Sequence, residues 1–183
     1  GVSRLGYTNG GPNTYSNSDL SLTTYNGKGD PVFTGSTFTG RIWNGTVYYD
    51  TKGSDTLSVN PNSISAATGG KVDFSLNAGA MYANGQYLVM GSVTGTNPGT
   101  LLPGGTVLPV NFDAFTTITV NFANSAFFPN TLGMLDGNGQ ATAGFDTIGP
   151  LDPALVGLMM YFAFPVPAAP WFASNYVTVT IDA

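Results

Sequence analysis

Hydrophobic and polar residues alternate in short runs along most of this chain. In the segment KVDFSLN at 71–77 every second residue is apolar, and residues 19–23 show the same alternation. A strand places successive side chains on opposite faces of a sheet, so this spacing predicts strands with one buried face. In 71–77 we expect Val72, Phe74 and Leu76 to point into a core.

Turn-forming residues separate these runs along the whole chain. Strands are predicted at residues 19–23, 32–42, 46–51, 57–59, 71–77, 115–122, 132–135, 140–146, 155–164 and 175–181. Asn26-Gly27, Asn44-Gly45 and the tetrapeptide at 136–139 are typical hairpin turns. About ten to twelve short strands in this arrangement predict an all-β fold, a β-sandwich or jelly-roll-like domain with an N-terminal extension.

The stretch from Ala78 to Asp113 carries no charge before its last residue and holds several glycines. We interpret them as turn and bulge positions, where a side chain would obstruct the backbone. They do not predict a phosphate-binding loop, because no helix pattern follows them. The glycines concerned are Gly91, Gly95, Gly99, Gly104 and Gly105.

The first eighteen residues differ from the rest, since they are polar and glycine-rich. The sequence favours a mobile or loosely docked terminus over an arm that adds a strand to a neighbouring subunit. In the second case Val2, Leu5 and Tyr7 would make the contact. Residues 19–183 are predicted to form one β-sandwich domain, with 54–183 as its main body.

Charge is scarce, since only 8% of residues are charged, but the chain holds 12 Phe and 9 Tyr. Disordered chains are poor in aromatic residues, so we expect this chain to fold. A net charge of −5 with five scattered basic residues argues against a nucleic-acid partner. A charge-poor β chain rich in Asn, Thr and Gly suits an extracellular or cell-surface location. Its start at Gly1, rather than at a methionine, fits either a mature chain after signal cleavage or an arbitrary boundary of the sequence.

Residues 154–173 are apolar throughout, which raises the question of membrane insertion. Pro165, Pro167 and Pro170 interrupt the second half of the segment. The uninterrupted part is far shorter than the roughly twenty residues that a helical span needs. We therefore predict a buried strand followed by a proline-rich turn, and no membrane span.

The residue types that usually carry catalysis are missing, since the chain has no His, no Cys and no Glu. Without cysteine there are no disulfides or thiolate metal sites. A pair of aspartates, as in glycoside hydrolysis, is the remaining catalytic option. The candidates are Asp113, Asp136, Asp146 and Asp152. None lies in a motif that demands this role, so we predict a non-enzyme without a cofactor.

Asp136, Asn138 and Gln140 place oxygen ligands on alternate positions, as a calcium loop does. That loop also requires Gly at its sixth position and an acidic residue at its twelfth. Those positions hold Ala141 and Thr147 here. The sequence therefore favours an ordinary β-turn over a metal site.

Two further surface features bear on binding and modification. Asn44-Gly45-Thr46 is an N-glycosylation sequon at a predicted hairpin tip, with the unmodified state favoured. Exposed aromatic rings would suit a sugar-binding platform, although core and edge packing is the favoured role. The aromatic candidates are Trp43, Tyr48, Tyr49 and Trp171.

Motifs from about Ser54 to Ala183 carry a family resemblance. They are LNAGA at 76–80, GQYLVMGSVTGTNPG at 85–99, LPGGTVLPVNFDAF at 102–115, LGMLDGNGQATAGF at 132–145, LVGLMMYFAF at 155–164 and SNYVTVTI at 174–181. In order and spacing this segment resembles a β-rich C-terminal module of secreted and surface proteins of planctomycete-type bacteria. The resemblance implies a fold rather than an activity, and it brings no catalytic residues.

Two departures from that module matter. Many relatives have one or two histidines where this chain has Tyr161-Phe162. The relatives also usually append the module to a larger protein, whereas here about fifty residues of β-forming sequence precede it.

These features favour a non-catalytic extracellular structural subunit. We expect it to assemble with itself into a filament, sheath or surface layer, through β-strand addition between subunits. The alternative is a carbohydrate- or surface-binding module, with a polysaccharide as partner. A hydrolase with paired aspartates is the third hypothesis.

Overall fold

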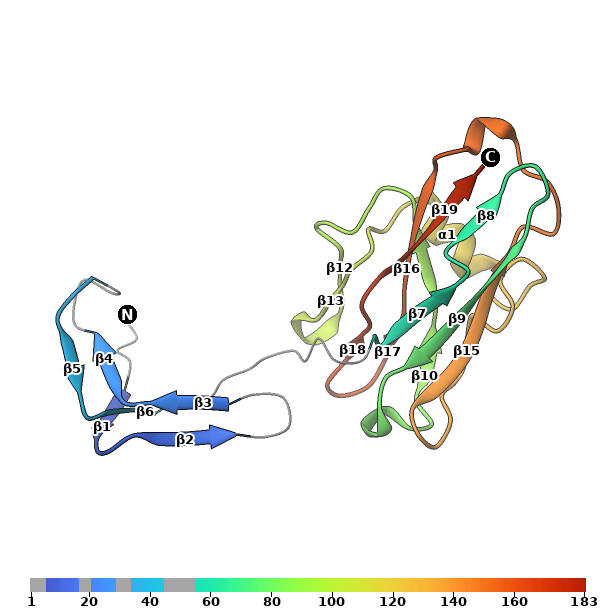
Figure 1. The fold of residues 1–183 in the computed structure, drawn as a ribbon. Coiled ribbons are helices and arrows are strands. Elements are labelled where there is room, and N and C mark those ends of the chain that lie inside the picture. The colour runs from blue at the N-terminus through green and yellow to red at the C-terminus, as the bar shows by residue number, and fades with distance from the viewer. Residues whose placement is uncertain (1–5, 17–20, 29–33, 45–54) are drawn as a thin grey trace. The chain divides into compact units, whose positions relative to one another are not determined.

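The computed structural model describes residues 6–16, 21–28, 34–44 and 55–183 (Figure 1). Contacts between Cα atoms divide the chain into two compact units, residues 1–53 and residues 54–183. The division coincides with the start of the segment that carries the family resemblance. We call the first the N-terminal unit and the second the body.

The N-terminal unit consists of antiparallel strand pairs. Strands β1 and β6, β2 and β3, and β4 and β5 each form a two-stranded sheet. Their bounds are β1 (Gly6–Asn9), β2 (Asn13–Ser16), β3 (Ser21–Thr24), β4 (Asn26–Lys28), β5 (Thr37–Thr39) and β6 (Arg41–Asn44). Strands β1 and β2 lie inside the predicted arm, and here they pair with strands of the same unit.

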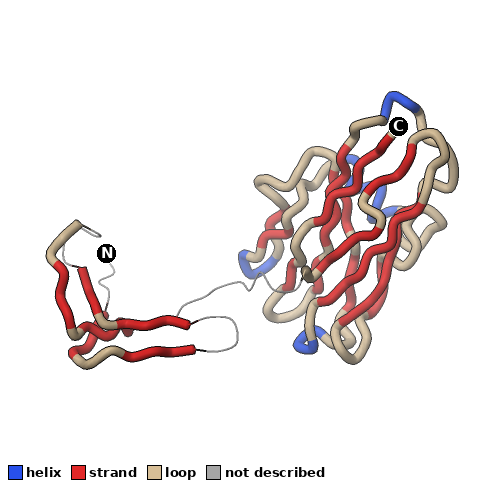
Figure 2. Tube along the Cα trace, viewed as in Figure 1, coloured by secondary structure: helices blue, strands red, loops and turns tan. Residues whose placement is uncertain are grey.

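The body holds thirteen short strands and one α-helix. The strands are β7 (Leu57–Asn60), β8 (Ser63–Ser65), β9 (Lys71–Asn77), β10 (Gln86–Leu88), β11 (Met90–Ser92), β12 (Thr100–Leu101), β13 (Val107–Leu108), β14 (Leu132–Met134), β15 (Gln140–Asp146), β16 (Met159–Ala163), β17 (Pro165–Val166), β18 (Phe172–Ala173) and β19 (Val177–Asp182). The helix is α1 (Ala114–Asn121), and the 3₁₀ turns are η1 (Ala80–Tyr82), η2 (Pro103–Gly105) and η3 (Pro153–Leu155). In the part of the chain that the structure describes, helix is confined to these short segments (Figure 2). The predicted all-β, sandwich-like fold is confirmed.

Two sheets form the sandwich of the body. One has the strand order β15-β9-β7 and the other β11-β16-β19-β8. Their inner faces meet at Phe74 of β9 and Phe162 of β16, whose ring centroids lie 4.9 Å apart. As predicted, Val72, Phe74 and Leu76 are buried while the residues between them are exposed.

One stretch of chain belongs to both sheets. Strand β7 pairs with β9 in the first sheet, and β8, only two residues later, pairs in parallel with β19 in the second. Segment 57–65 therefore joins the two layers along one side of the sandwich. In Figure 1, β7 and β8 follow one another beside β19.

A second apolar cluster lies on the outer side of the β11–β16 pair. Met90 and Ala163, from these two strands, pack against Leu108 and Val110 from the stretch 93–113. Four of the five predicted turn glycines lie in that stretch with φ between 81° and 104°. They are Gly95, Gly99, Gly104 and Gly105, and left-handed backbone of this kind favours glycine.

Gly91 has a different reason to be glycine. It lies within β11, and a Cβ there would lie 2.6 Å from Cε1 of Phe115 and 3.0 Å from Cε1 of Phe162. Its backbone N–H donates to Oγ1 of Thr119 on α1. The missing side chain therefore lets helix α1 approach the edge of the sheet.

The prediction of a strand at 115–122 is wrong, because these residues form helix α1. Asp113 caps the helix, since its carboxylate accepts from the backbone N–H of Thr116 while the Thr116 hydroxyl accepts from the backbone N–H of Asp113. The buried side chains of α1 are Thr116 and Thr119, and Ile118 is exposed. Apolar alternation was misleading here because Ile118, Val120 and Phe122, whose spacing suggested a strand, are exposed.

The prediction of a turn at Asn26-Gly27 is also wrong, because both residues lie in β4 and pair with β5. A Cβ at Gly27 would lie 3.3 Å from Cγ of Arg41, so a close side chain, rather than a turn, favours glycine there. The predicted strand at 46–51 lies outside the described residues. Nineteen strands appear in the described parts of the chain, against about ten to twelve expected, because ten short strands lie outside the predicted runs and the run at 32–42 is divided between β5 and β6. The ten are β1, β2, β4, β8, β10, β11, β12, β13, β17 and β18.

The apolar segment 154–173 forms the end of η3 and strands β16 to β18. Phe162, Phe164 and Val166 are buried in the core of the body. Within the described residues, no helix is both long and apolar enough to cross a membrane.

Candidate functional site

The four candidate catalytic aspartates all bind backbone N–H groups close by. Asp136 accepts from Asn138, Asp146 from Ile148 and Asp152 from Ala154, each two residues further along the chain. Asp113 accepts from Thr116. Short-range bonds of this kind are the usual function of aspartate at turns and helix starts.

Asp113 makes the largest number of contacts among the four. Its Oδ2 accepts from the hydroxyl and backbone N–H groups of residues 92–94 at 2.8–3.0 Å, while Oδ1 accepts from Thr116. Burial alone would raise the pKa of Asp113, but the hydrogen bonds from Thr116, Val93, Ser92 and Thr94 outweigh it. They hold the pKa well below its usual range, so the carboxylate stays ionised and fastens α1 to the loop after β11.

The weak metal candidates Asp136, Asn138 and Gln140 lie at the turn between β14 and β15. Oδ1 of Asp136 accepts from the backbone N–H groups of Asn138 and Gln140, each at 2.8 Å. The Asp136 carbonyl also accepts from Gly139 at 3.0 Å. Among the described residues no group of three or more His, Cys, Asp or Glu side chains could hold a metal ion.

Several predicted contact and modification residues fall outside the described structure. Val2 and Leu5 precede the first described residue, and Tyr7 lies in β1 with only its backbone described. Asn44 ends β6, and the rest of its sequon lies beyond the described segment. The same applies to Tyr48 and Tyr49, and to the side chain of Trp43.

Most sheet edges of the body are covered by neighbouring chain. Helix α1 lies along β11, the backbone of Pro129 and Phe127 accepts from β15, and residues 65–69 fold back beside β8. An unpaired edge strand can form hydrogen bonds with a strand of another chain, and natural proteins cover or interrupt such edges. Two edge strands, β7 and β14, are covered in a different way.

An asparagine side chain binds each of these two edges as a strand backbone would. The Asn175 amide accepts from the N–H of Leu57 and donates to its C=O, both at 2.9 Å. On β14, Asn124 accepts from the N–H of Leu132 at 3.0 Å and donates to its C=O at 2.8 Å. We call Asn175 and Asn124 the edge clamps, since each satisfies both outward groups of one edge residue.

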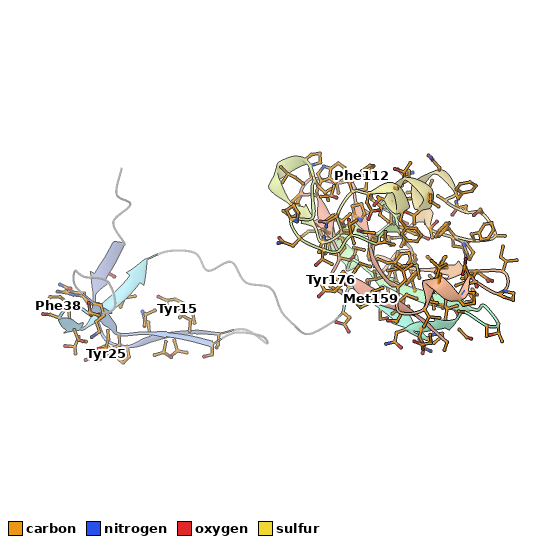
Figure 3. The ribbon with its side chains drawn as sticks, turned by 90° about the horizontal axis from the view of Figure 1, so that it is seen from above. Tyr15, Tyr25, Phe38, Phe112, Met159 and Tyr176 are labelled. Carbon is orange, nitrogen blue, oxygen red and sulfur yellow. The ribbon has the colours of Figure 1, made fainter. Side chains whose placement is uncertain are left out.

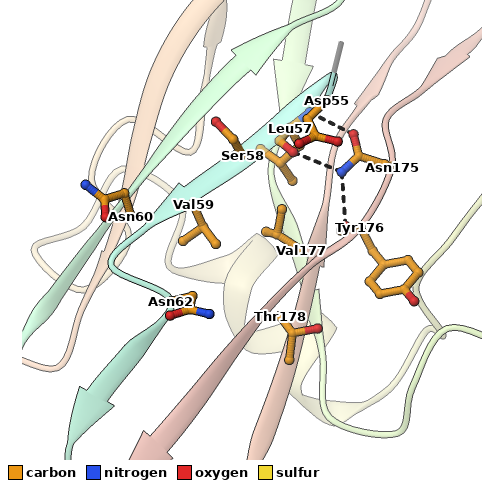
Figure 4. A pocket seen from close by; sticks show the side chains of 10 residues that line it. All are labelled: Asp55, Leu57, Ser58, Val59, Asn60, Asn62, Asn175, Tyr176, Val177 and Thr178. Atoms are coloured by element: carbon orange, nitrogen blue, oxygen red, sulfur yellow. Dashed lines mark hydrogen bonds between the residues drawn. The ribbon is translucent and has the colours of Figure 1, made fainter. Parts of the chain in front are cut away.

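A groove of about 420 Å³ runs between β7 and β19 (Figure 4). Its lining consists of Asp55, Leu57, Ser58, Val59, Asn60, Asn62, Asn175, Tyr176, Val177 and Thr178. Asn175 bridges one end, and at the other end the N–H of Thr180 donates to the Asn62 carbonyl at 3.0 Å. The groove is thus the gap between the two sheets before β8 joins β19.

Backbone groups on both walls of the groove are unpaired. Alternate residues of a strand direct their N–H and C=O to opposite sides. Because Leu57 faces Asn175 and Thr180 faces Asn62, Val59 and Thr178 also face the groove. Within the described residues, neither Val59 nor Thr178 makes a hydrogen bond across it.

Tyr176 is an exposed aromatic residue of the groove, with 47% of its surface accessible. Its ring meets that of Tyr161 edge-on, with centroids 6.0 Å apart and planes at 66°. Figure 3 shows Tyr176 and Met159 on the surface of the body. Trp171 is half-buried beside the β17–β18 pair.

The N-terminal unit has almost no buried side chain in its described part. Only Thr24 is buried there, and its hydroxyl finds no partner within the described residues. Tyr15, Tyr25 and Phe38 are 54%, 39% and 46% exposed. Figure 3 labels these three rings, of which Tyr15 lies on β2, Phe38 on β5 and Tyr25 between β3 and β4.

Sequence reasoning missed both edge clamps and the groove. The Asn175 clamp joins residues 118 positions apart, and no periodicity reports such a contact. The one local signal is the position of Ser174-Asn175 directly before an alternating strand. Asn124 has φ of 60°, a conformation in which asparagine is enriched, but nothing in the sequence identifies its partner.

Comparisons with protein-family models, with curated proteins and with solved structures find no match to this chain.

Proposed function

We propose that this protein is a non-catalytic extracellular structural subunit that assembles with further copies of itself into a filament, sheath or surface layer. The observation that carries the proposal is the N-terminal unit, whose strand pairs expose Tyr15, Tyr25 and Phe38. Isolated two-stranded sheets are marginally stable in water at best. Such a unit gains stability when its exposed side chains are covered by another surface.

The gain from covering these rings is substantial. Full burial of a large apolar side chain stabilises by about 1.5–3 kcal/mol, and roughly half of each of the three side chains is still exposed. A second copy is the proposed partner, because a net charge of −5 on 183 residues opposes close association only weakly. The use of the candidate aspartates in turns and caps supports a non-catalytic role.

Strand addition between subunits has a suitable edge in β14. Its Met134 is 62% exposed, and by the alternation of the strand its backbone points outward like that of the clamped Leu132. A short edge with an exposed apolar side chain is a typical place for a strand from another chain to pair. The edges of the N-terminal strand pairs supply further sites of the same kind.

Light scattering after size exclusion and electron microscopy of the purified full chain test this proposal. We expect regular polymers that grow with protein concentration. A triple variant Tyr15→Ser, Tyr25→Ser, Phe38→Ser should shift the chain toward monomer. The matched variant Tyr15→Phe, Tyr25→Phe, Phe38→Tyr keeps all three rings and should still assemble. A wild-type chain that stays monomeric, or a serine variant that assembles equally well, would refute the proposal.

We also propose a second function, the binding of polysaccharide by the body. The specific observation in its favour is Tyr176, an exposed ring next to a groove lined by amide and hydroxyl side chains. Aromatic rings stack on the apolar faces of sugars, and amides bind their hydroxyl groups. Retention of the chain by polysaccharide tests this function, and no retention by any polysaccharide tried would refute it.

A further inference from the structure

We infer that the groove between β7 and β19 is the saccharide site, and that it takes an uncharged polysaccharide. This inference rests on the second function proposed above. It adds the residues that make contact and the class of sugar that fits.

Tyr176 supplies the stacking surface of the site. Its ring is held edge-on by Tyr161 at 6.0 Å while 47% of the residue stays exposed. A side chain that is already held in place loses little conformational freedom when a ligand covers it. In Figure 4 the ring lies on the side of β19 away from β7, so a polysaccharide in the groove reaches Tyr176 by passing over β19, where one sugar unit can lie on the ring.

Unpaired polar groups inside the groove match the hydroxyl groups of a sugar. Val59 and Thr178 present open backbone N–H and C=O groups from opposite walls. Asn60 and Asn62 are exposed, and neither side-chain amide makes a hydrogen bond within the described residues. Each amide offers donors and an acceptor, and each sugar hydroxyl does the same.

The charge of the groove selects against acidic sugars. Asp55 is the one charged side chain in its lining, and no Lys or Arg lines it. An anionic polysaccharide would bring its carboxylates or sulfates close to this aspartate without a compensating cation. A neutral chain meets no such repulsion.

The width of the groove argues against a peptide strand as its occupant. Cα atoms of β7 and β19 approach within 8 Å of each other. A strand hydrogen-bonded to both walls needs roughly 9.6 Å, twice the spacing of neighbouring strands. Hydroxyl groups and single side chains fit in this gap, as the Asn175 amide does at one end. The volume, about 420 Å³, also lies in the usual range for ligand sites.

Affinity electrophoresis of the full chain tests the site. The gels contain hydroxyethyl cellulose, laminarin, xylan or galactomannan, with alginate as the anionic control. We expect retardation in at least one neutral gel and none in alginate. Tyr176→Ala should weaken binding about tenfold, since it removes the stacking surface, whereas Tyr176→Phe should keep it. Asn62→Ala should weaken binding about threefold, by loss of a net hydrogen bond.

Phe112→Ala, which removes an exposed ring of the body outside the groove, should leave the retardation unchanged. If Tyr176→Ala and Asn62→Ala are retarded like the wild type, the groove is not the site, although polysaccharide binding itself stands. If no gel retards the wild type, both the site and the second function are refuted, whereas retardation in alginate alone refutes the site as described and leaves the second function standing. Equal retardation in alginate and in the neutral gels would refute the preference for uncharged chains.

Discussion

The Asn175 clamp is a small contact, and we expect its removal to lower the free energy of unfolding of the body by a large amount. The substitution Asn175→Ala removes an amide whose Oδ1 accepts from Leu57 N–H and Thr56 Oγ1, both at 2.9 Å. Its Nδ2 donates to the carbonyls of Leu57 and Tyr176 at 2.9 and 3.0 Å. Loss of the clamp leaves the N–H and C=O of Leu57 without partners, next to a side chain that is fully buried.

The size of the effect follows from these unpaired groups. An unsatisfied buried donor or acceptor costs about 1–3 kcal/mol, and the groove admits water that recovers part of this cost for Leu57. We therefore expect Asn175→Ala to lower the free energy of unfolding by about 2–4 kcal/mol. Most of the loss should come from β7, because three of the four hydrogen bonds of the amide go to Leu57, the first residue of that strand, and to Thr56 just before it.

Urea unfolding followed by tyrosine and tryptophan fluorescence and by circular dichroism measures this change. The control is Asn138→Ala, at an exposed turn position where the backbone N–H, rather than the side chain, makes the hydrogen bond. We expect the control to stay within about 0.5 kcal/mol of the wild type. Equal midpoints for the two variants, at equal m-values, would refute the argument that the amide stabilises the edge of β7.

Three further predictions follow from contacts of the body, all measured by urea unfolding. Asp113→Asn should destabilise by about 1–2 kcal/mol at pH 7. Because folding lowers the pKa of Asp113, its contribution is complete above the unfolded-state pKa of about 4 and is lost as pH falls through the folded-state value. The gap between wild type and variant should therefore narrow at pH 3, and a constant gap would contradict the ionised cap. Gly91→Ala should cost about 1–3 kcal/mol by overpacking against the core, while Gly137→Ala, whose Cβ would meet nothing within 4 Å, should be nearly neutral. Asn124→Gly keeps the left-handed backbone but removes two hydrogen bonds to Leu132, so a loss of about 1–3 kcal/mol is expected, and no change would mean that water replaces the clamp.

The sequence predicted those parts of the fold that depend on neighbours along the chain. Strand β9 is the clearest case, since the alternation of Val72, Phe74 and Leu76 reports directly which face is buried. Turn glycines such as Gly99 were also predicted, because its φ of 81° is left-handed backbone, which favours glycine whatever the distant contacts are. Period-2 patterns and turn chemistry both act over a few residues, so a single sequence contains them.

Helix α1 shows where such reasoning fails. Its buried residues Thr116 and Thr119 are polar. The Thr119 hydroxyl donates to the backbone carbonyl of Thr116 and accepts from the backbone N–H of Gly91 on the neighbouring strand β11. The apolar residues at 118, 120 and 122 are exposed, so their spacing says nothing about the core. The better signal was the pair Asp113 and Thr116, the spacing of a capping box.

The candidate site depended even more on distant contacts. Both edge clamps and the groove bring together residues whose separation ranges from 8 to more than 110 positions. Their residue types, Asn, Thr and Tyr, are common on any β surface and carry no motif.

The parallel register of β8 and β19 has a mechanical consequence. Thr180, Ile181 and Asp182 lie beside Ser63, Ile64 and Ser65, with both strands running in the same direction. A tensile load that pulls residue 55 backward and residue 182 forward would slide these strands past each other, so their hydrogen bonds bear the force together instead of opening one at a time. In a subunit that is stretched along its chain, this strand pair would resist rupture by shear, and the Asn175 bridge would add to the same resistance at the start of β7.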